Sequence, residues 1–302
     1  MRDIHPEYAL RMNRVLDHID RHLDQPLDLD TLADVAHFSR YHFHRVFASW
    51  VGETFGDYLR RRRLETAAWM LPGHPDRSVL DIALNVGFGS AEAFARAFKG
   101  HFGRTPTEWR AGKLRNSGQA DRNTGQACPG AAADNGHSIH FDEEHPLDIR
   151  IIDMPPVKVA YLRFIGPYGP PIGDFWRREV APWLAANDLQ RRPRYGIGYD
   201  NPAVTPPDKC RYDACVEVPA DFEARGKFNV MTLPGGRYAA RRFTGNPVEI
   251  GEAWVSIFRD WLPRSGFQVD ARHCFEYYGT TFDEDVKNGS FSCDICIPVR
   301  PL

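Results

Sequence analysis

Two segments of the chain share one residue pattern, LDLDTLADVAHFSRYHFHRVFASWVGETF at residues 27–55 and SVLDIALNVGFGSAEAFARAFKGHFGRTP at residues 78–106. The second segment matches the first without a gap at an offset of 51 residues. The identical pairs include Leu29/Leu80, Asp30/Asp81, Val35/Val86, Ser39/Ser90, Phe43/Phe94, Arg45/Arg96 and Phe47/Phe98. An ungapped internal match of this kind indicates a duplicated structural unit.

Each unit is predicted to form a short helix, a tight turn and a second helix. The turn carries Ala36 in the first unit and Gly87 in the second, and Ser39 and Ser90 stand where they can cap the next helix. Phenylalanines at a spacing of four residues line one side of each second helix and leave a polar side exposed. This pattern is typical of a helix-turn-helix, which places its second helix in the major groove of DNA.

Between the two units, residues 55–70 are predicted to form one helix that carries Arg60, Arg61, Arg62 and Arg63. Four consecutive arginines surround a helix, so they cannot all face one partner. They can form a solvated face paired with nearby acids, or contact DNA phosphates. We expect roughly two of the four to contact phosphate, Arg61 among them.

The charge of the chain is unevenly distributed. The formal net charge is −2, which taken alone argues against a nucleic-acid partner. Residues 1–34 carry 4 basic and 8 acidic groups, whereas residues 35–115 carry 13 basic and 7 acidic groups. The chain therefore has a basic centre with a net charge of +6, which suits a local anionic partner.

Residues 5–111 resemble the AraC/XylS-type DNA-binding domain, which has two helix-turn-helix units and a linking helix. The resemblance rests on the F-x-R-x-F cores at 43–47 and 94–98, on DIALNVGF at 81–88 and on FARAFKGHFGRTPTEWR at 94–110. It implies base contacts from Arg40, Tyr41, His44 and Arg45 and from Ala91, Glu92, Ala95 and Arg96. The small residues of the second helix leave mainly Arg96 for direct readout, and both Arg45 and Arg96 could instead form intramolecular salt bridges.

The composition then changes and marks a boundary. From Ala111 to Asn135 the chain is rich in Gly, Ala, Asn and Gln and shows little hydrophobic periodicity. We predict a DNA-binding domain at 1–111, a flexible linker at 112–146 and a second domain at 147–302.

The second domain also contains a repeat. Residues 149–169 match residues 228–247 at an offset of 79, and each copy is predicted to run strand, helix, strand, strand. Two copies predict an α+β domain with pseudo-twofold symmetry and a ligand groove between them. The sharpest difference between the copies is Glu276, which aligns with Gly198 and lies among aromatic residues. Such a carboxylate suits a cationic ligand, although it could also be an exposed strand residue.

Residues 147–300 resemble the GyrI-like (SbmC-type) effector-binding domain, which also occurs in multidrug-sensing regulators. The resemblance rests on GRYAARRFTG (236–245), AWVSIFRDWL (253–262), FEYYG (275–279) and DICIPV (294–299). It implies that Glu276 is the cleft carboxylate, and it makes Tyr161, Tyr199 and Tyr278 candidate aromatic walls. The tryptophans that recur in both copies, Trp176, Trp183, Trp254 and Trp261, are expected in the core.

The sequence predicts no metal site and no cofactor. Cys293 and Cys296 lie in an alternating strand, where residues three apart point to opposite faces. The irregular set of six cysteines and the lack of an export signal suggest reduced thiols in a cytoplasm.

The predicted fold is a multidomain chain, an all-α double helix-turn-helix domain followed by an α+β domain of two pseudo-symmetric β-α-β-β repeats. The predicted function is a cytoplasmic, nucleoid-associated transcription regulator that is not an enzyme. Its expected partners are promoter double-stranded DNA and a small cationic or aromatic effector, with RNA polymerase as a candidate and no membrane. The alternatives are a GyrI-like hydrolase with Glu276 as its base, or a module that sequesters a ligand or a protein.

Overall fold

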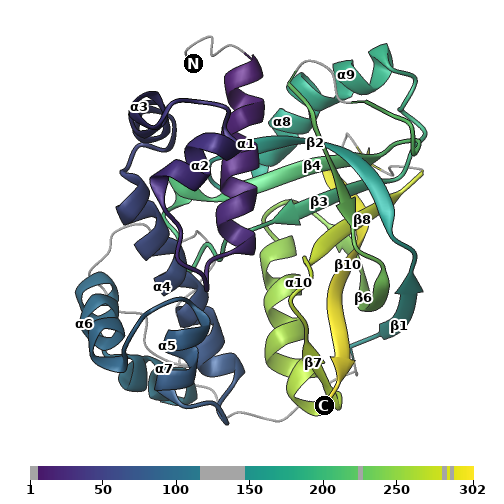
Figure 1. Ribbon diagram of the computed structural model, residues 1–302. Helices are drawn as coiled ribbons and strands as arrows, with labels where there is room; N and C mark the ends of the chain where they lie inside the picture. Colours follow the sequence, from purple (N-terminus) through teal and green to yellow (C-terminus); the bar gives the residue numbers. More distant parts are fainter. Residues whose placement is uncertain (1–5, 116–146, 224–226, 281–283, 286–288) are drawn as a thin grey trace. The chain divides into compact units, whose positions relative to one another are not determined.

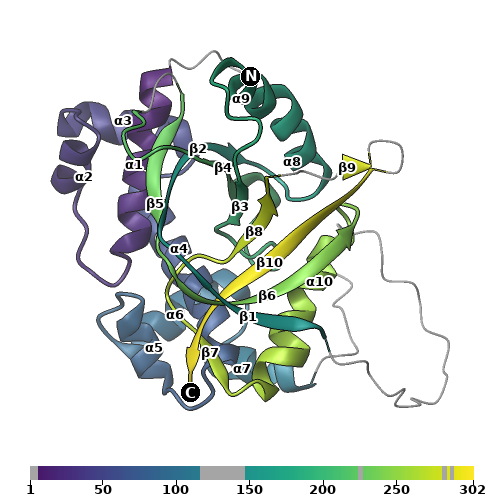
Figure 2. The same ribbon diagram turned by 90° about the vertical axis from the view of Figure 1, so that its right-hand side faces the viewer.

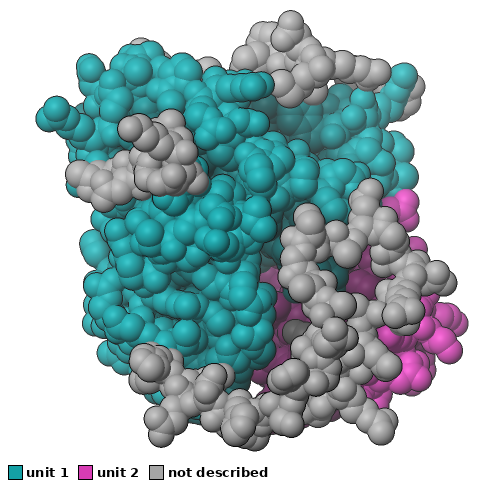
Figure 3. All heavy atoms as spheres, turned by 180° about the vertical axis from the view of Figure 1, so that it is seen from behind, with its two compact units in different colours: residues 1–21, 27–55, 147–302 teal, residues 22–26, 56–146 magenta. Residues whose placement is uncertain are grey.

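A computed structural model describes residues 6–115, 147–223, 227–280, 284–285 and 289–302. Contacts between residues divide the chain into two compact units, which Figure 3 colours separately. The first unit contains residues 1–21, 27–55 and 147–302, and the second contains residues 22–26 and 56–146. The division therefore places the first helix-turn-helix with the C-terminal sheet.

The helices of the first unit are α1 (Pro6–Arg21), α2 (Leu29–Val35) and α3 (Arg40–Val51). The carboxylate of Asp28 caps α2 by accepting a hydrogen bond of 2.7 Å from the amide of Thr31. Apolar side chains from all three helices are buried, among them Leu16 and Ile19 of α1, Leu32 of α2 and Phe43 and Phe47 of α3. α1 contacts α2, and α2 contacts α3, so the three helices are linked in a chain of contacts.

The second unit contains α4 (Phe55–Gly73, of which Phe55 belongs to the first unit), α5 (Val79–Asn85), α6 (Ala91–Phe102) and α7 (Pro106–Arg115). Ser78 and Asp81 form a reciprocal capping box at the start of α5. Trp109 of α7 donates from its indole nitrogen to the carbonyl of Ala68 at 3.0 Å. Because α7 continues to Arg115, the expected linker at 112–146 begins as helix, and residues 116–146 lie outside the described part of the chain.

Both helix-turn-helix units form as predicted, but the repeat is not gapless. Each turn closes with a hydrogen bond from an amide to a carbonyl five residues earlier, Phe38 to Ala33 and Phe88 to Ala83. These bonds align the first helices at an offset of 50, whereas the second helices align at 51. The turn of the second unit is therefore one residue longer, and the left-handed position belongs to His37 (φ 54°) and Gly87 (φ 85°) rather than to Ala36 and Gly87.

The C-terminal region is a ten-stranded antiparallel sheet within the described residues (Figures 1 and 2). Copy one contains β1 (Ile149–Met154), β2 (Val157–Ile165), β3 (Arg194–Gly198) and β4 (Arg211–Glu217). Copy two contains β5 (Asn229–Leu233), β6 (Gly236–Gly245), β7 (Phe267–Val269), β8 (Phe275–Gly279), β9 (Glu284–Asp285) and β10 (Ser290–Pro301).

The strand order confirms the predicted pseudo-twofold symmetry. The main path runs β1-β6-β10-β8-β3-β4-β2-β5, and it reads the same from both ends when the two copies are exchanged. Each copy begins with a short strand that precedes the predicted strand-helix-strand-strand pattern. These first strands are exchanged, since β1 pairs with β6 of copy two and β5 pairs with β2 of copy one. The two copies thus form one continuous sheet.

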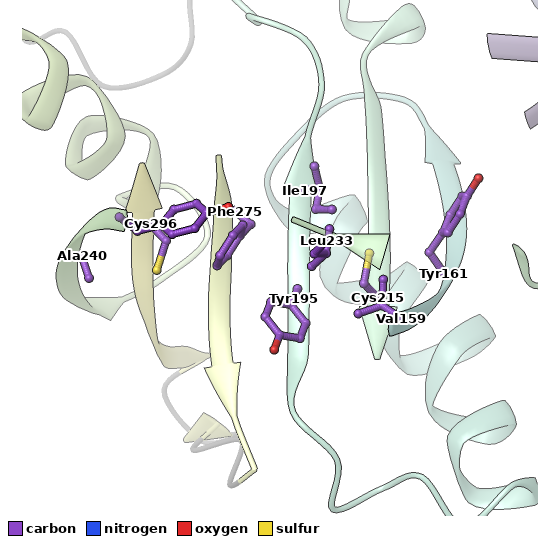
Figure 4. Packing of buried hydrophobic residues seen from close by; sticks show 10 residues of the cluster. Val159, Tyr161, Tyr195, Ile197, Cys215, Leu233, Ala240, Phe275 and Cys296 are labelled. Carbon is purple, nitrogen blue, oxygen red and sulfur yellow. The ribbon is translucent and has the colours of Figure 1, made fainter. Parts of the chain in front are cut away.

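One face of this sheet is covered by helices of both copies. They are α8 (Pro170–Phe175), η1 (Trp176–Val180) and α9 (Ala181–Ala186) in copy one, and α10 (Ile250–Ser256), η3 (Ile257–Trp261) and η4 (Leu262–Arg264) in copy two. A further short 3₁₀ helix, η2 (Pro207–Lys209), precedes β4. Helix-covered cores form separately in each copy. A third cluster on the other face joins strands of both copies, with Tyr161, Tyr195 and Phe275 among its members (Figure 4).

The strand registers correct the sequence alignment of the copies. Tyr161 lies opposite Cys215 in copy one, and its counterpart Ala240 lies opposite Cys296 in copy two. The last strands therefore align at an offset of 81 rather than 79. By the same argument the counterpart of Glu276 is Gly196, not Gly198, and these two residues lie opposite each other on the pseudo-twofold axis.

Candidate functional site

The predicted recognition helix of the first unit is α3. Phe43 and Phe47 are fully buried and hold the helix against its own unit, while His44 and Arg45 are exposed. The helical periodicity therefore separates core positions from candidate DNA contacts as expected. The side chains of Arg40 and Tyr41 lie outside the described residues.

The corresponding helix of the second unit is α6. Phe94 and Phe98 are buried, Glu92 and Arg96 are exposed, and Ala91 is partly buried like Ala95. Ser90 caps the helix by accepting a hydrogen bond of 3.2 Å from the amide of Ala93. Hydrogen bonds from the backbone amide of Glu92 itself and from Ser90 lower the pKa of the Glu92 carboxyl. Glu92 is thus engaged at the helix N-terminus, which leaves Arg96 as the exposed cation of this helix among the predicted contacts.

The prediction for the arginines of α4 needs correction. Arg61 and Arg62 are 8% and 7% exposed, and both donate to the buried carboxylate of Glu65 at 2.9–3.1 Å. Arg63 donates to the carbonyl oxygens of Leu23 and Gln25 at 2.8 Å. Arg61 is therefore a structural ion-pair residue, and Arg60 is the member of the run that is exposed.

Glu276 of β8 lies on the helix-covered face of the sheet, where side chains of both copies surround its carboxylate. Tyr278 donates its hydroxyl to Glu276 Oε2 at 2.7 Å, and Trp254 of α10 donates its indole N–H to Oε1 at 3.2 Å. Tyr212 of β4 contributes a longer hydroxyl contact of 3.5 Å to Oε2. Trp176 completes the group by donating to the Tyr212 hydroxyl at 3.1 Å. We call these five residues the Glu276 cleft, after the cleft carboxylate that the family resemblance of the sequence implies.

The electrostatics of the Glu276 cleft favour a positively charged occupant. Burial raises the pKa of Glu276 above its ordinary value, against the hydrogen bonds of Tyr278, Trp254 and Tyr212, which lower it. These donors are neutral, and no Arg or Lys side chain forms an ion pair with Glu276 within the described residues. Such a carboxylate offers a negative charge, and the rings around it offer faces that an organic cation can contact.

Gly196 is the reason that this cleft can form at the symmetry axis. A Cβ atom at position 196 would lie 2.1 Å from the Tyr212 hydroxyl and 2.8 Å from Glu276 Oε2. Both distances are far below a normal contact, so a side chain here would displace the carboxylate or its donor. The absence of a side chain in copy one therefore makes room for the acid of copy two.

Of the four predicted ligand residues, the structure brings together only Glu276 and Tyr278. The hydroxyl of Tyr161 donates to Asp17 at 2.6 Å, and that of Tyr199 donates to Asp213 at 2.8 Å. Alternation explains the difference, because Tyr161 lies opposite Cys215 on β4, three residues from Tyr212 and on the other face of the sheet. Tyr161 and Tyr199 are therefore not walls of the Glu276 cleft.

Sequence reasoning missed three members of the cleft. Trp176 and Trp254 were expected in the core, and both do pack against the helix-covered cores, but they are partly buried and direct their indole N–H groups into the polar network. Their recurrence at matching positions of the two copies was the available signal. Tyr212 carried no such signal, because its role depends on the cross-strand register.

Other features of the described residues do not add to this cleft. A separate cavity of about 580 Å³ is lined by Arg21, Thr232, Arg272 and neighbours, and its charged pair Asp270–Arg272 is mutually satisfied. No cluster of three potential metal ligands occurs in the described part of the chain. Cys293 and Cys296 lie in different core clusters, on opposite faces of β10 as expected. None of the described helices combines the length and the apolar character that a membrane span requires.

Comparison with known protein families defines the class of the molecule. Residues 147–300 match the GyrI-like small molecule binding domain, and residues 32–112 match a helix-turn-helix domain. The first match covers half of the chain, so the protein belongs to the GyrI-like family, and its helical part is of the AraC type. The protein is a DNA-binding transcription regulator with a small-molecule-binding domain.

Individual relatives are similar to the helical half of the chain. The regulatory protein SoxS of Escherichia coli K12 is 40% identical over 92 residues, which are 30% of this chain and 85% of SoxS. The right origin-binding protein of the same strain is 44% identical over 92 residues, which are 30% of this chain and 32% of that protein. The solved DNA-binding domain of AdpA, in complex with a target DNA, is 31% identical and covers 36% of this chain and 98% of its own, with a TM-score of 0.33.

Proposed function

We propose that this regulator binds a small aromatic cation in the Glu276 cleft and contacts DNA through the exposed residues of α3 and α6. The observation that carries the ligand proposal is the Glu276 carboxylate, which receives hydrogen bonds from neutral aromatic donors of both copies. A bound cation would supply the missing charge, and the rings of Trp176 and Tyr278, whose centroids are 6.2 Å apart, would contact its apolar surface.

The ligand proposal is tested by calorimetric titration of the full-length protein with tetraphenylphosphonium. We expect Glu276→Gln to weaken binding at least tenfold, because the amide keeps the shape of the side chain but removes its charge; a tenfold loss corresponds to about 1.4 kcal/mol. Triphenylphosphine oxide, a neutral aromatic analogue, should bind weakly to both proteins.

The matched control is Glu252→Gln, which removes an exposed acid of α10 in the same copy. This variant should bind tetraphenylphosphonium like the wild type. Equal affinity in wild type and Glu276→Gln would exclude Glu276 as the cation site.

The DNA proposal rests on Arg96, with His44 and Arg45 on the other recognition helix and with Arg40 and Tyr41 as further proposed contacts. Selection of genomic fragments by the purified protein would identify its sites. On such a site we expect Arg96→Ala to cost about 1–3 kcal/mol of DNA-binding free energy and to weaken the base preference at one position. Arg177→Ala, which removes an exposed arginine of the other domain, should leave DNA binding unchanged.

We also propose that the protein is a binder and not an enzyme. A hydrolase of this type needs a base beside a bound water or a second acid, and the counterpart of Glu276 on the symmetry axis is Gly196. Its place of action would be the cytoplasm, at the nucleoid, where promoter DNA and RNA polymerase are found. Turnover of a reactive small molecule that disappears in Glu276→Gln would contradict this assignment.

A further inference from the structure

The face of the sheet opposite the Glu276 cleft holds a second polar cluster, and here the contacts reach the first helix. Arg163 Nη2 of β2 lies 2.8 Å from Asp17 Oδ1 of α1, and Arg211 Nη1 of β4 lies 2.5 Å from Asp20 Oδ2. Tyr161 donates to the other oxygen of Asp17 at 2.6 Å. We call Tyr161, Arg163 and Arg211 the docking face.

Each arginine of the docking face is also held by a carboxylate of its own domain. Asp213 accepts two hydrogen bonds from Arg163 at 2.7 Å, and Asp200 accepts from Arg211 at 2.9 and 3.0 Å. The arginine side chains are 1% and 3% exposed. Their guanidinium groups are therefore fixed in position, so little side-chain entropy is lost when α1 supplies the remaining acceptors.

Copy two shows what this face looks like without a helix against it. The registers pair Arg163 and Asp213 with Arg242 and Asp294, which form a looser ion pair of 3.7 Å. The Arg242 side chain is 55% exposed. The counterparts of Tyr161 and Arg211 are Ala240 and Ser292, which cannot make these contacts. The fold keeps the ion pair in both copies, but only copy one has the residues that bind α1.

A third ionic contact extends this arrangement to the end of the recognition helix. Lys209 of η2 lies 2.9 Å from Glu53, which follows α3 by two residues. The three acids Asp17, Asp20 and Glu53 thus oppose three cations of the C-terminal domain. Two of these acids, Asp17 and Asp20, belong to the acidic segment 1–34, which has a net charge of −4.

We propose that copy one of the GyrI-like domain is a dedicated docking surface for this chain's own first helix, and that docking holds the first helix-turn-helix unit to the ligand-binding domain. Because α1 contacts α2 and α2 contacts α3, we expect a constraint on α1 to reach the rest of this helix-turn-helix unit. The inference does not depend on the nature of the ligand.

The test is hydrogen–deuterium exchange of the full-length protein, comparing wild type with the double variant Asp17→Asn/Asp20→Asn. Both substitutions are isosteric and leave each arginine with its second carboxylate, so the sheet should stay folded. We expect amides of α1 to exchange about tenfold faster in the variant, with smaller increases in α2 and α3.

Two further variants decide the interpretation. Glu53→Gln should raise exchange at the end of α3, and Arg242→Gln on the open face of copy two should change nothing in residues 6–51. Unchanged exchange of α1 in the double variant would overturn the proposal, as would an equal effect of Arg242→Gln.

Discussion

The two copies of the C-terminal domain have one scaffold but carry different side chains at matching positions. Both keep an Arg–Asp ion pair on equivalent strands. The pair of copy one is buried under α1, and the arginine of the pair in copy two is exposed. On the symmetry axis the roles are reversed, since copy two supplies Glu276 while copy one supplies Gly196. Differences at a few matching positions thus separate the proposed docking face on one side of the sheet from the proposed ligand site on the other.

The largest expected effect is a difference in stability between variants of the two Arg–Asp ion pairs. Arg163→Ala should cost about 3–5 kcal/mol of unfolding free energy, because it leaves Asp213 and Asp17 without a cation in a buried site. Arg242→Ala should cost about 0–1 kcal/mol, because its pair is exposed. Urea denaturation followed by tryptophan fluorescence measures both, and equal losses would show that burial by α1 does not distinguish the copies.

The second prediction tests which glycine is the counterpart of Glu276. Gly196→Ala should abolish tetraphenylphosphonium binding or weaken it more than tenfold, because the new methyl group meets the Tyr212 hydroxyl and the carboxylate. Gly198→Ala meets the Tyr168 hydroxyl at 3.3 Å and should change affinity less than twofold. A larger effect of Gly198→Ala would favour the sequence alignment, which pairs Glu276 with Gly198, over the pseudo-twofold axis at Gly196 and Glu276.

A third prediction concerns communication between the docking face and the Glu276 cleft. On β4, Tyr212 contacts the cleft, whereas its neighbours Arg211 and Asp213 serve the docking face. If this strand couples the two sites, Asp17→Asn/Asp20→Asn should change tetraphenylphosphonium affinity about fivefold or more. Glu7→Gln, an exposed acid of α1, is the control. Binding that is identical in all three proteins would mean that the sites are independent; absence of binding even in wild type would instead contradict the proposed function.

The smallest expected effect is a gain in stability of the ligand-free protein. Burial raises the folded-state pKa of Glu276. Below a pH of about 4.3, the ordinary pKa of a glutamate, the carboxyl is protonated in the folded and the unfolded protein, so its burial does not lower the free energy of unfolding. As pH rises through the folded-state pKa, wild type loses stability that Glu276→Gln retains. Thermal unfolding should show no difference near pH 4 and a Tm about 2–4 °C higher for the variant at neutral pH, the shift that ~1 kcal/mol produces. A pH-independent difference would contradict the burial of an ionisable group.

Local patterns of the sequence predicted much of the fold. Phe43, Phe47, Phe94 and Phe98 mark the buried sides of α3 and α6 because helical periodicity reflects burial directly. The same reasoning failed for Arg61. Periodicity does not distinguish four consecutive arginines, and it is the ion pairs with Glu65 that place Arg61 and Arg62 in the interior. It also missed the extra residue in the second turn, which leaves the apolar pattern intact.

The sites were harder to predict than the elements. Glu276 was found because a charge that one copy lacks stands out in a duplicated sequence. Tyr161 and Tyr199 were misplaced, since an aromatic residue in a strand does not reveal which face it joins without the register of its neighbours. Tyr212 was missed for the same reason, whereas Trp254 lies in the helix α10, where its recurrence in both copies favoured a place in the core.

The sequence by itself thus determined the two helix-turn-helix units, the duplicated sheet domain and the acid at its centre, because periodicity and internal repeats are local properties. The tertiary structure alone decided which glycine makes room for Glu276, which aromatics surround it and which arginines bind α1. These depend on strand register and on contacts between residues more than a hundred positions apart, as for Asp17 with Arg163, and no local pattern records such distances.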